Sequence, residues 1–109
     1  MSPFELKGTA LITGASTGIG AVYADRLAKR GYDLILVARN VERLSESAAR
    51  LKTTGRIIET LQADLTKAAD VLRVAERLRS DSSITALVNN AGIGSAGTLL
   101  DSNVDDLSQ

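Results

Sequence analysis

The chain has 109 residues, which is enough for one small domain or for part of a larger one. Its 13 basic and 13 acidic residues balance to a formal charge of zero, so charge gives no reason to expect nucleic acid or an anionic membrane as a partner. The absence of cysteine and histidine excludes disulfides, thiolate zinc sites and the commonest general base, and no metal site is expected. Without a signal-peptide pattern or a membrane span in the sequence, we expect a soluble, cytoplasmic protein.

The chain begins with a strand pattern, a helix pattern and a second strand. Thr9–Thr13 is a short apolar strand, and helical spacing follows from about Gly18 to Arg30. Gly31 then suits a carboxyl-terminal cap, because glycine takes the left-handed conformation that ends many helices. Leu34–Ala38 is uninterrupted apolar sequence, which is typical of a parallel strand covered on both faces.

The pattern continues with a second helix, a third strand, a third helix and a fourth strand. Asn40 can cap the second helix, which keeps its spacing up to Gly55. Arg56–Ala63 is a less purely apolar strand and is therefore expected nearer an edge of the sheet. Thr66 can cap the third helix, and Ile84–Val88 is the fourth strand. The residues expected to form the regular faces of these two helices are Val41, Leu44, Ala48 and Leu51 in the second, and Val71, Leu72, Ala75 and Leu78 in the third.

Strands that alternate with helices predict an α/β fold with a parallel sheet and right-handed crossovers. With the strand order 3-2-1-4, the first two helices lie on one face of the sheet and the third lies on the other. The direction of winding reverses between the first and fourth strands, and this reversal opens a crevice at their carboxyl ends. Glycine-containing segments follow both of these strands, at residues 14–20 and 92–97, so two independent signals converge on one place.

The segment Thr13–Gly20 reads Thr-Gly-Ala-Ser-Thr-Gly-Ile-Gly and joins the first strand to the first helix. Its glycines let the backbone turn sharply and approach a bound group. The helix that follows directs unpaired N–H groups and the positive end of its dipole at an anion. The spacing G-x-x-x-G-x-G differs from the common G-x-G-x-x-G, and no Gly-Lys-Ser/Thr follows as in a P-loop. This segment therefore indicates a phosphate-holding turn of a dinucleotide-binding domain.

Two further motifs give the chain a family resemblance. Asn89-Asn90-Ala91-Gly92 ends the fourth strand, and Asp64-Leu65 follows the third. Together with the glycine turn, they make the chain closely resemble the classical short-chain dehydrogenase/reductase family. The resemblance covers essentially the whole chain but only the N-terminal portion of the family's domain. Residues 1–109 are thus expected to form part of a single NAD(P)-binding, Rossmann-like doubly wound domain, with the C-terminal half absent.

The resemblance implies a role for each motif. The glycine turn lies around the pyrophosphate and the adenosine ribose, Asp64 accepts a hydrogen bond from the adenine amine, and Asn90 begins the segment that approaches the nicotinamide. Asn89 is expected to tie neighbouring strands together instead of contacting the ligand. The alternatives are a purely structural turn for the glycines and a solvated or helix-capping Asp64. The implied cofactor-binding residues are Gly14, Ala15, Ser16, Thr17, Gly18, Ile19, Gly20, Asp64, Leu65, Asn90, Ala91 and Gly92.

Arg39 adds a preference between the two nicotinamide cofactors. It ends the second strand, where NAD-binding members of such folds carry an acidic residue for the ribose 2′-hydroxyl. A guanidinium forms paired, charge-assisted bonds with phosphate, worth about 1.5–3 kcal/mol each. We therefore expect NADP(H) to be preferred over NAD(H). The alternative is a solvated Arg39 that pairs with Glu42 or Asp64.

The family transfers a hydride between the nicotinamide and a small-molecule carbonyl or secondary alcohol, with a Tyr-x-x-x-Lys pair, a Ser and an Asn. Neither tyrosine of this chain fits, because leucines stand four residues after Tyr23 and Tyr32. No catalytic residue is assigned, so the chain alone is expected to bind cofactor without turning it over. The alternative function is a non-catalytic dinucleotide-binding or interaction module.

The fourth strand, central in the complete fold, is left at an edge of the sheet in this chain. An exposed edge strand predicts marginal stability or self-association, and a homo-oligomer is possible.

Overall fold

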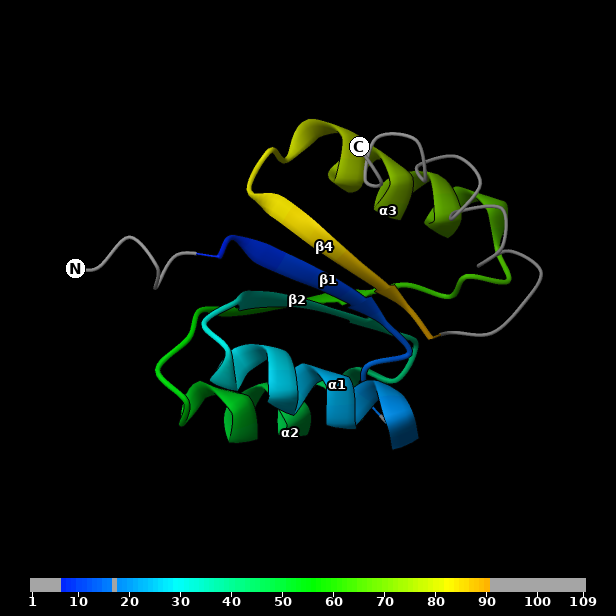
Figure 1. The fold of residues 1–109 in the computed structure, drawn as a ribbon. Helices are drawn as coiled ribbons and strands as arrows, with labels where there is room; N and C mark the ends of the chain where they lie inside the picture. Colours follow the sequence, from blue (N-terminus) through cyan, green and yellow to red (C-terminus); the bar gives the residue numbers. More distant parts are fainter. Residues whose placement is uncertain (1–6, 17, 91–109) are drawn as a thin grey trace.

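Residues 7–16 and 18–90 are described by the structure, a computed structural model. The strands are β1 (Thr9–Thr13), β2 (Asp33–Ala38), β3 (Ile58–Gln62) and β4 (Ile84–Asn89), and the helices are α1 (Gly18–Lys29), α2 (Val41–Lys52) and α3 (Ala68–Ser80). All strands pair in parallel, in the order β3-β2-β1-β4, which confirms the predicted topology. Figure 1 shows α1 and α2 on one face of the sheet and α3 on the other. Within the described residues, no helix has the length and apolar character needed to cross a membrane.

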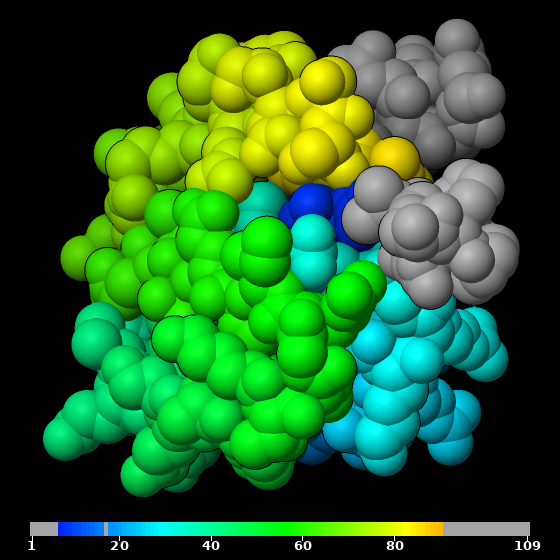
Figure 2. Space-filling view, turned by 90° about the vertical axis from the view of Figure 1, so that its left-hand side faces the viewer, coloured from blue at the N-terminus to red at the C-terminus, as the bar shows by residue number. Residues whose placement is uncertain are grey.

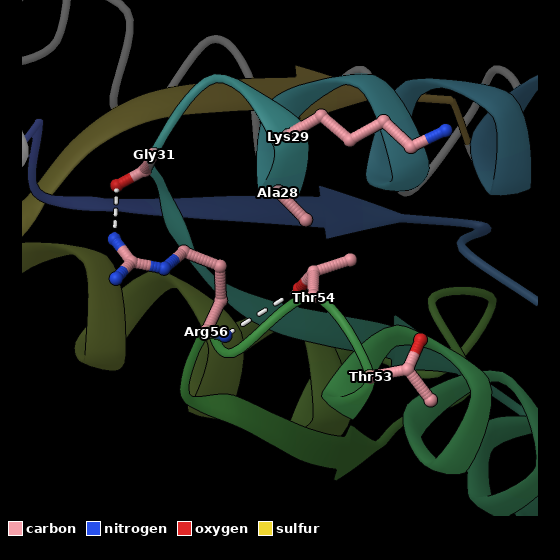
Figure 3. A pocket seen from close by; sticks show the side chains of 6 residues that line it. All are labelled: Ala28, Lys29, Gly31, Thr53, Thr54 and Arg56. Atoms are coloured by element: carbon pink, nitrogen blue, oxygen red, sulfur yellow. Dashed lines mark hydrogen bonds between the residues drawn. The ribbon is translucent and has the colours of Figure 1, made fainter.

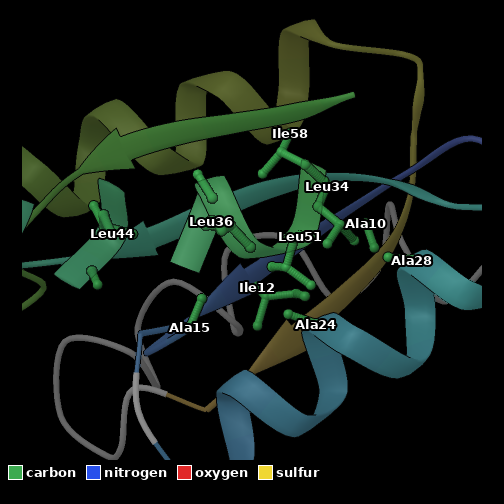
Figure 4. Close-up of a cluster of buried hydrophobic side chains, with 12 residues drawn as sticks. Ala10, Ile12, Ala15, Ala24, Ala28, Leu34, Leu36, Leu44, Leu51 and Ile58 are labelled. Carbon is green, nitrogen blue, oxygen red and sulfur yellow. The ribbon is translucent and has the colours of Figure 1, made fainter. Parts of the chain in front are cut away.

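The two middle strands are buried because helices cover both of their faces. Alternate residues of β1 and β2 point to opposite sides of the sheet, so each strand supplies two apolar clusters. In the space-filling view of Figure 2, only a small blue area near the start of the chain shows between the yellow segment that includes β4 and the green and cyan segments below it. The cluster under α1 and α2, drawn in Figure 4, includes Ala10, Ile12, Leu34, Leu36, Leu44, Leu51 and Ile58. The cluster under α3 includes Leu11, Ile35, Val37, Val71, Val74 and Leu78.

The first helix approaches the sheet through small side chains. Gly20, Ala24 and Ala28 are its buried residues, and they recur every four positions along one side. Small residues in such a row allow the helix backbone to lie close to β1 and β2. This close approach sets the position of the amino end of α1, directly after the glycine turn.

Three details of the helices differ from the sequence-based expectation. Leu72 is 63% exposed and Val74 is fully buried, because the face of α3 that meets the sheet follows the spacing 71, 74, 75 and 78. Val41 is 58% exposed, at the first position of α2, so the buried face of that helix begins one turn later, at Leu44. Lys67, and not Thr66, occupies the cap position of α3.

The predicted cap of α2 and the edge position of β3 are confirmed. The Asn40 side chain accepts a hydrogen bond from the main-chain N–H of Arg43 at 2.9 Å, as expected for a helix cap. β3 lies at the end of the sheet. It is joined to α3 by Arg77, whose guanidinium donates two bonds to the Glu59 carboxylate, at 2.6 and 2.7 Å, and one to Asp81 Oδ2 at 2.9 Å.

The bonds from the Arg77 guanidinium to Glu59 and Asp81 make the stability of the fold depend on pH. Its hydrogen bonds hold the pKa of Glu59 below the ordinary 4.5. The contribution of the pair is therefore present above pH 4.5 and is lost as the pH falls through the lowered pKa of the folded state. We expect Arg77→Gln to lower the free energy of unfolding by about 1 kcal/mol at pH 7, as is usual for exposed pairs in a network.

The measurement is urea unfolding of both proteins from pH 7 to pH 3. The difference in stability between Arg77→Gln and the unsubstituted chain should shrink below pH 4.5, because acid protonates the Glu59 partner. Arg77→Lys keeps the charge without the planar fork and should fall between the two. A difference that stays constant down to pH 3 would contradict this account.

Candidate functional site

The glycine turn leaves β1 at the carboxyl edge of the sheet. Gly14 has φ +63° and Gly18 has φ +55°, a left-handed conformation that favours glycine at both positions. Gly20 is required for a different reason. A Cβ added there would lie 2.1 Å from the carbonyl oxygen of Gly14, so the first turn of α1 packs directly against the backbone of the glycine turn.

The backbone at Gly18 is open, in contrast to that at Gly20. A Cβ on Gly18 would meet nothing within 4 Å. The first turn of α1 carries no acidic residue, whereas α2 has Glu42 and α3 has Asp70 in the same place. The positive end of the α1 dipole is thus not offset by an acidic side chain of its own first turn. A bare backbone beside such a helix end fits the phosphates of a dinucleotide.

Thr13 joins this turn to the end of β4. Its side chain is fully buried, and its hydroxyl donates to Asn89 Oδ1 at 3.0 Å while accepting from the main-chain N–H of Asn90 at 2.9 Å. The expected structural role of Asn89 is confirmed by this bond. The Asn90 side chain lies close to Gly20, because a Cβ on Gly20 would be 2.8 Å from Asn90 Nδ2. The structure thus brings the two sequence motifs into contact.

No role was assigned to Thr13 from the sequence, although a signal existed. A threonine at the last position of an apolar strand, opposite an asparagine on the neighbouring strand, can bond across the sheet. That inference needs the register Thr13↔Asn89, which only the folded chain supplies.

We expect Thr13→Val to weaken both the fold and the site. Valine keeps the shape of threonine but removes the bond to Asn89 and the acceptor for the Asn90 N–H. Losing hydrogen bonds of partly buried groups costs about 1–3 kcal/mol. Urea unfolding should show a loss in this range, and Thr13→Ser, which keeps the hydroxyl, should lose less. Equal losses for valine and serine would show that packing, and not the hydroxyl, accounts for the effect.

Two of the residues expected at the site belong to the core. Ala15 is fully buried in the cluster under α1 and α2, and its N–H donates to the carbonyl of Val37 at 3.3 Å. Leu65 is 8% exposed and packs in the cluster under α3.

The other residues that the sequence assigned to the turn are more accessible or lie outside the described part of the chain. Ser16 is half-buried in the turn, and Ile19 is 64% exposed on the first turn of α1. Thr17, Ala91 and Gly92, which the sequence also assigned to the site, lie outside the described residues.

Arg39 and Asp64 lie at the same carboxyl edge, next to the ends of β2 and β3. Arg39 is exposed, and its carbonyl accepts a hydrogen bond from Gln62 Nε2 at 3.1 Å. The Thr66 hydroxyl and N–H, helped by the charge of Arg39, hold the pKa of Asp64 below its usual value. Asp64 is therefore an ionised hydrogen-bond acceptor at neutral pH. Among the described residues, the ion pairs do not include Arg39.

A separate hollow lies at the opposite edge of the sheet, where α1 and α2 end. In Figure 3, dashed lines join Arg56 to the carbonyl of Gly31 and to the hydroxyl oxygen of Thr54. Arg56 Nη1 donates to the carbonyl of Gly31 at 2.9 Å, and the hydroxyls of Thr53 and Thr54 donate to carbonyls of the last turn of α2. These groups satisfy helix carboxyl ends, which carry negative partial charge and disfavour an anion. The hollow is lined by Ala28, Lys29, Gly31, Thr53, Thr54 and Arg56.

Comparison with known proteins agrees with the geometry at the carboxyl edge. The family model described as short chain dehydrogenase matches residues 8–109. Human 17-beta-hydroxysteroid dehydrogenase type 3 is 42% identical over 85 residues, covering 77% of this chain and 27% of the relative. A short-chain dehydrogenase from Sphingobium yanoikuyae, solved in complex with NADPH, is 44% identical with a TM-score of 0.83, covering 92% of this chain and 46% of that one.

A second solved structure extends the likeness to an enzyme with a named substrate class. The bulky-bulky ketone specific alcohol dehydrogenase from Comamonas testosteroni is 52% identical, with a TM-score of 0.78, over 82% of this chain and 36% of that one. The chain therefore spans well under two thirds of the length of these relatives.

Proposed function

The chain belongs to the short chain dehydrogenase family, and from this premise we propose that it forms the cofactor-binding part of an NADP(H)-dependent oxidoreductase. The observation that carries the proposal is the contact between the glycine turn and Asn90 at the carboxyl ends of β1 and β4. It places an open backbone, a helix amino end and an amide side chain in one region. The NADPH of the Sphingobium yanoikuyae relative supports the choice of cofactor.

Each part of the edge has a role in this proposal. Gly18 and the first turn of α1 would hold the pyrophosphate, since both leave the backbone open to an anion. Arg39 would hold the ribose 2′-phosphate, and its exposed guanidinium has no competing partner among the ion pairs of the described residues. Asp64, kept ionised, would accept from the adenine amine through its carboxylate.

The proposed reaction is hydride transfer to or from a small-molecule carbonyl or secondary alcohol. A bound nicotinamide supplies or accepts the hydride, and the residues of this chain hold and orient the cofactor. The ketone named for the Comamonas testosteroni relative supports this substrate class. Proton transfer needs an acid–base side chain, and neither Tyr23 nor Tyr32 has a lysine four residues further along. We propose that residues 1–109 alone bind cofactor without catalysing turnover.

Calorimetric titration of the purified chain with NADP+ and with NAD+ tests this function. We expect saturable binding of NADP+ that is at least about tenfold tighter than that of NAD+, because a charge-assisted bond of about 1.5–3 kcal/mol exceeds the roughly 1.4 kcal/mol that a tenfold difference in affinity requires. A parallel assay with NADPH and a panel of bulky ketones should show no cofactor oxidation. Absence of binding to either nucleotide would refute the proposal, and ketone-dependent oxidation would refute its claim that the chain alone is inactive.

A further inference from the structure

Arg39 lies directly after β2, just beyond the point at which the pairing of β2 with β3 ends. The last paired residues of the two strands are Ala38 and Gln62, and the Ala63 N–H donates to the Ala38 carbonyl at 3.0 Å. The carbonyl of the next residue, Arg39, accepts a hydrogen bond from the Gln62 side chain, through Nε2, at 3.1 Å. The Gln62 side chain thus extends the link between the two strands by one residue.

The carbonyl that Gln62 binds belongs to the peptide unit that joins Arg39 to Asn40. Asn40 is fixed in turn as the cap of α2, since its side chain accepts from the main-chain N–H of Arg43 at 2.9 Å. The main chain of Arg39 is therefore held by β3 on one side and by the start of α2 on the other, while the Arg39 side chain is exposed. This arrangement fixes the base of the side chain and leaves the guanidinium accessible to a ligand.

Gln62 is itself held in place by α3. Arg73 Nη2 donates to the main-chain carbonyl of Gln62 at 2.9 Å and to Asp70 Oδ1 at 3.2 Å. The other carboxylate oxygen of Asp70 accepts from the Asp64 N–H at 2.8 Å. Two residues of α3 thus fix the end of β3, and the Gln62 side chain carries this fixed position across to Arg39.

The position of Arg39 matters because a carboxylate of opposite charge lies nearby. The Thr66 hydroxyl is the main group that lowers the pKa of Asp64, and the charge of Arg39 adds to this effect. If the Arg39 main chain were able to move, its guanidinium would be able to pair with Asp64 in competition with a phosphate. A long side chain also loses less conformational freedom on binding when its base is already held in place. The Gln62 bond therefore favours a guanidinium that is ready to bind phosphate.

We propose that Gln62 is a positioning residue for the preference for NADP(H) over NAD(H), because it holds the main chain of Arg39 where the guanidinium meets the ribose 2′-phosphate. The inference rests on the proposed cofactor-binding function and deepens it. NAD(H) has a hydroxyl in place of this phosphate, so the position of the guanidinium affects the binding of NADP(H) alone. Loss of the Gln62 bond should change the ratio of the two affinities and leave the affinity for NAD+ unchanged.

A purely structural role for Gln62 would give a different result. The adenine, both riboses and the pyrophosphate are common to the two nucleotides. A general loosening of the end of β3 would therefore weaken the binding of NADP+ and NAD+ alike, and the ratio of their affinities would not change. The ratio thus separates the positioning of Arg39 from an effect on the fold.

Calorimetric titration of NADP+ and NAD+ into Gln62→Leu tests the proposal. Leucine cannot donate to the Arg39 carbonyl, and we expect the ratio of NADP+ to NAD+ affinity to fall about three- to tenfold, the range of one neutral hydrogen bond. Thr60→Leu is the matched control, because Thr60 is also exposed and lies two positions earlier on the same side of β3. This control should leave the ratio unchanged.

A double variant tests whether Gln62 acts through Arg39. In an Arg39→Gln background there is no guanidinium to position, so Gln62→Leu should have no further effect on the ratio of affinities. A ratio that falls equally in both backgrounds would overturn the proposal, because Gln62 would then act on the nucleotide without Arg39. An unchanged ratio in Gln62→Leu alone, or an equal loss of affinity for both nucleotides, would also overturn it.

Backbone dynamics test the positioning without nucleotide. Nitrogen relaxation measured by NMR reports the order parameters of the Arg39 and Asn40 amides, which flank the carbonyl that Gln62 binds. In Gln62→Leu they should fall from about 0.85, typical of rigid backbone, toward the flexible range below about 0.6, and in Thr60→Leu they should not. Unchanged order parameters in Gln62→Leu would refute the positioning role.

The two proposals fail in different ways. If the unsubstituted chain binds neither nucleotide, the proposed function is wrong and the role of Gln62 in cofactor preference is wrong with it. If the unsubstituted chain prefers NADP+ and Gln62→Leu keeps that preference in full, only the role of Gln62 is refuted.

Discussion

Replacing Gly20 by alanine is expected to abolish measurable NADP+ binding and to lower the free energy of unfolding by about 3 kcal/mol, in the upper range for overpacking. The added Cβ would lie 2.1 Å from the Gly14 carbonyl oxygen, which is backbone and has no rotamer to change. The first turn of α1 must then move away from the glycine turn, and the open backbone at Gly18 moves with it. For a chain of this size, thermal unfolding should occur on the order of 10 °C lower or more.

Two other glycines separate the steric effect from general strain. Gly18 and Gly55 both have positive φ, and a Cβ on either would meet nothing within 4 Å. Alanine at each should cost a similar amount of stability, about 1–2 kcal/mol, for the left-handed conformation. Only Gly18→Ala should also weaken NADP+ binding, because Gly55 lies in the turn after α2. Normal NADP+ affinity in Gly20→Ala or in Gly18→Ala would contradict the proposed position of the pyrophosphate.

Changing Arg39 to aspartate is expected to reverse the cofactor preference. The substitution removes the guanidinium for the 2′-phosphate and supplies a carboxylate, which suits a ribose 2′-hydroxyl and repels a phosphate. Each lost charge-assisted bond is worth about 1.5–3 kcal/mol, so the ratio of NADP+ to NAD+ affinity should fall by roughly 10- to 100-fold. Calorimetric titration of both nucleotides into the variant and the unsubstituted chain gives the ratio.

A second arginine variant serves as the control for the change in net charge. Arg30→Asp makes the same change of two charges at an exposed residue just beyond the carboxyl end of α1, at the edge of the sheet away from the site. It should leave the affinity ratio unchanged. Arg39→Gln, which removes the charge without adding a carboxylate, should lower NADP+ affinity while leaving NAD+ affinity nearly the same. If Arg39→Asp and Arg30→Asp give the same ratio, the guanidinium has no specific role.

The fold could be predicted from the sequence because the local signals agreed with one another. The apolar run Leu34–Ala38 requires cover on both faces, and the alternation of strands and helices restricts the topology to parallel crossovers. The cap at Asn40 depends on a contact within three residues and was therefore visible in the sequence. Details that depend on distant neighbours were not. Leu72 has helical spacing but lies off the face that the sheet covers, and the position of that face is a property of the packed chain.

The candidate site shows the same division. The glycine turn could be identified from its residue types, because left-handed backbone and close packing both require glycine. The cap of α3 was misassigned because the Thr66 hydroxyl donates to Asp64 Oδ1, at 2.6 Å, in a local turn. Asp70, from the first turn of α3, accepts from the Asp64 N–H at 2.8 Å. The sequence contains all three residues, but which of them pair depends on how the chain leaves β3.

The row of small residues on α1 lets a substitution at its far end change the position of the amino end of the helix, where the anion is proposed to bind. Gly20 and Ala28 stand two turns apart, about 12 Å along the axis, and both rest against the sheet. A methyl or ethyl group added to the Ala28 side chain would push the carboxyl end of α1 away from the sheet. Because the helix is rigid, its amino end would then tilt as well. Substitutions far from the proposed nucleotide site would thus change the affinity for the nucleotide by changing the tilt of α1 against the sheet, although every residue of the glycine turn stays the same.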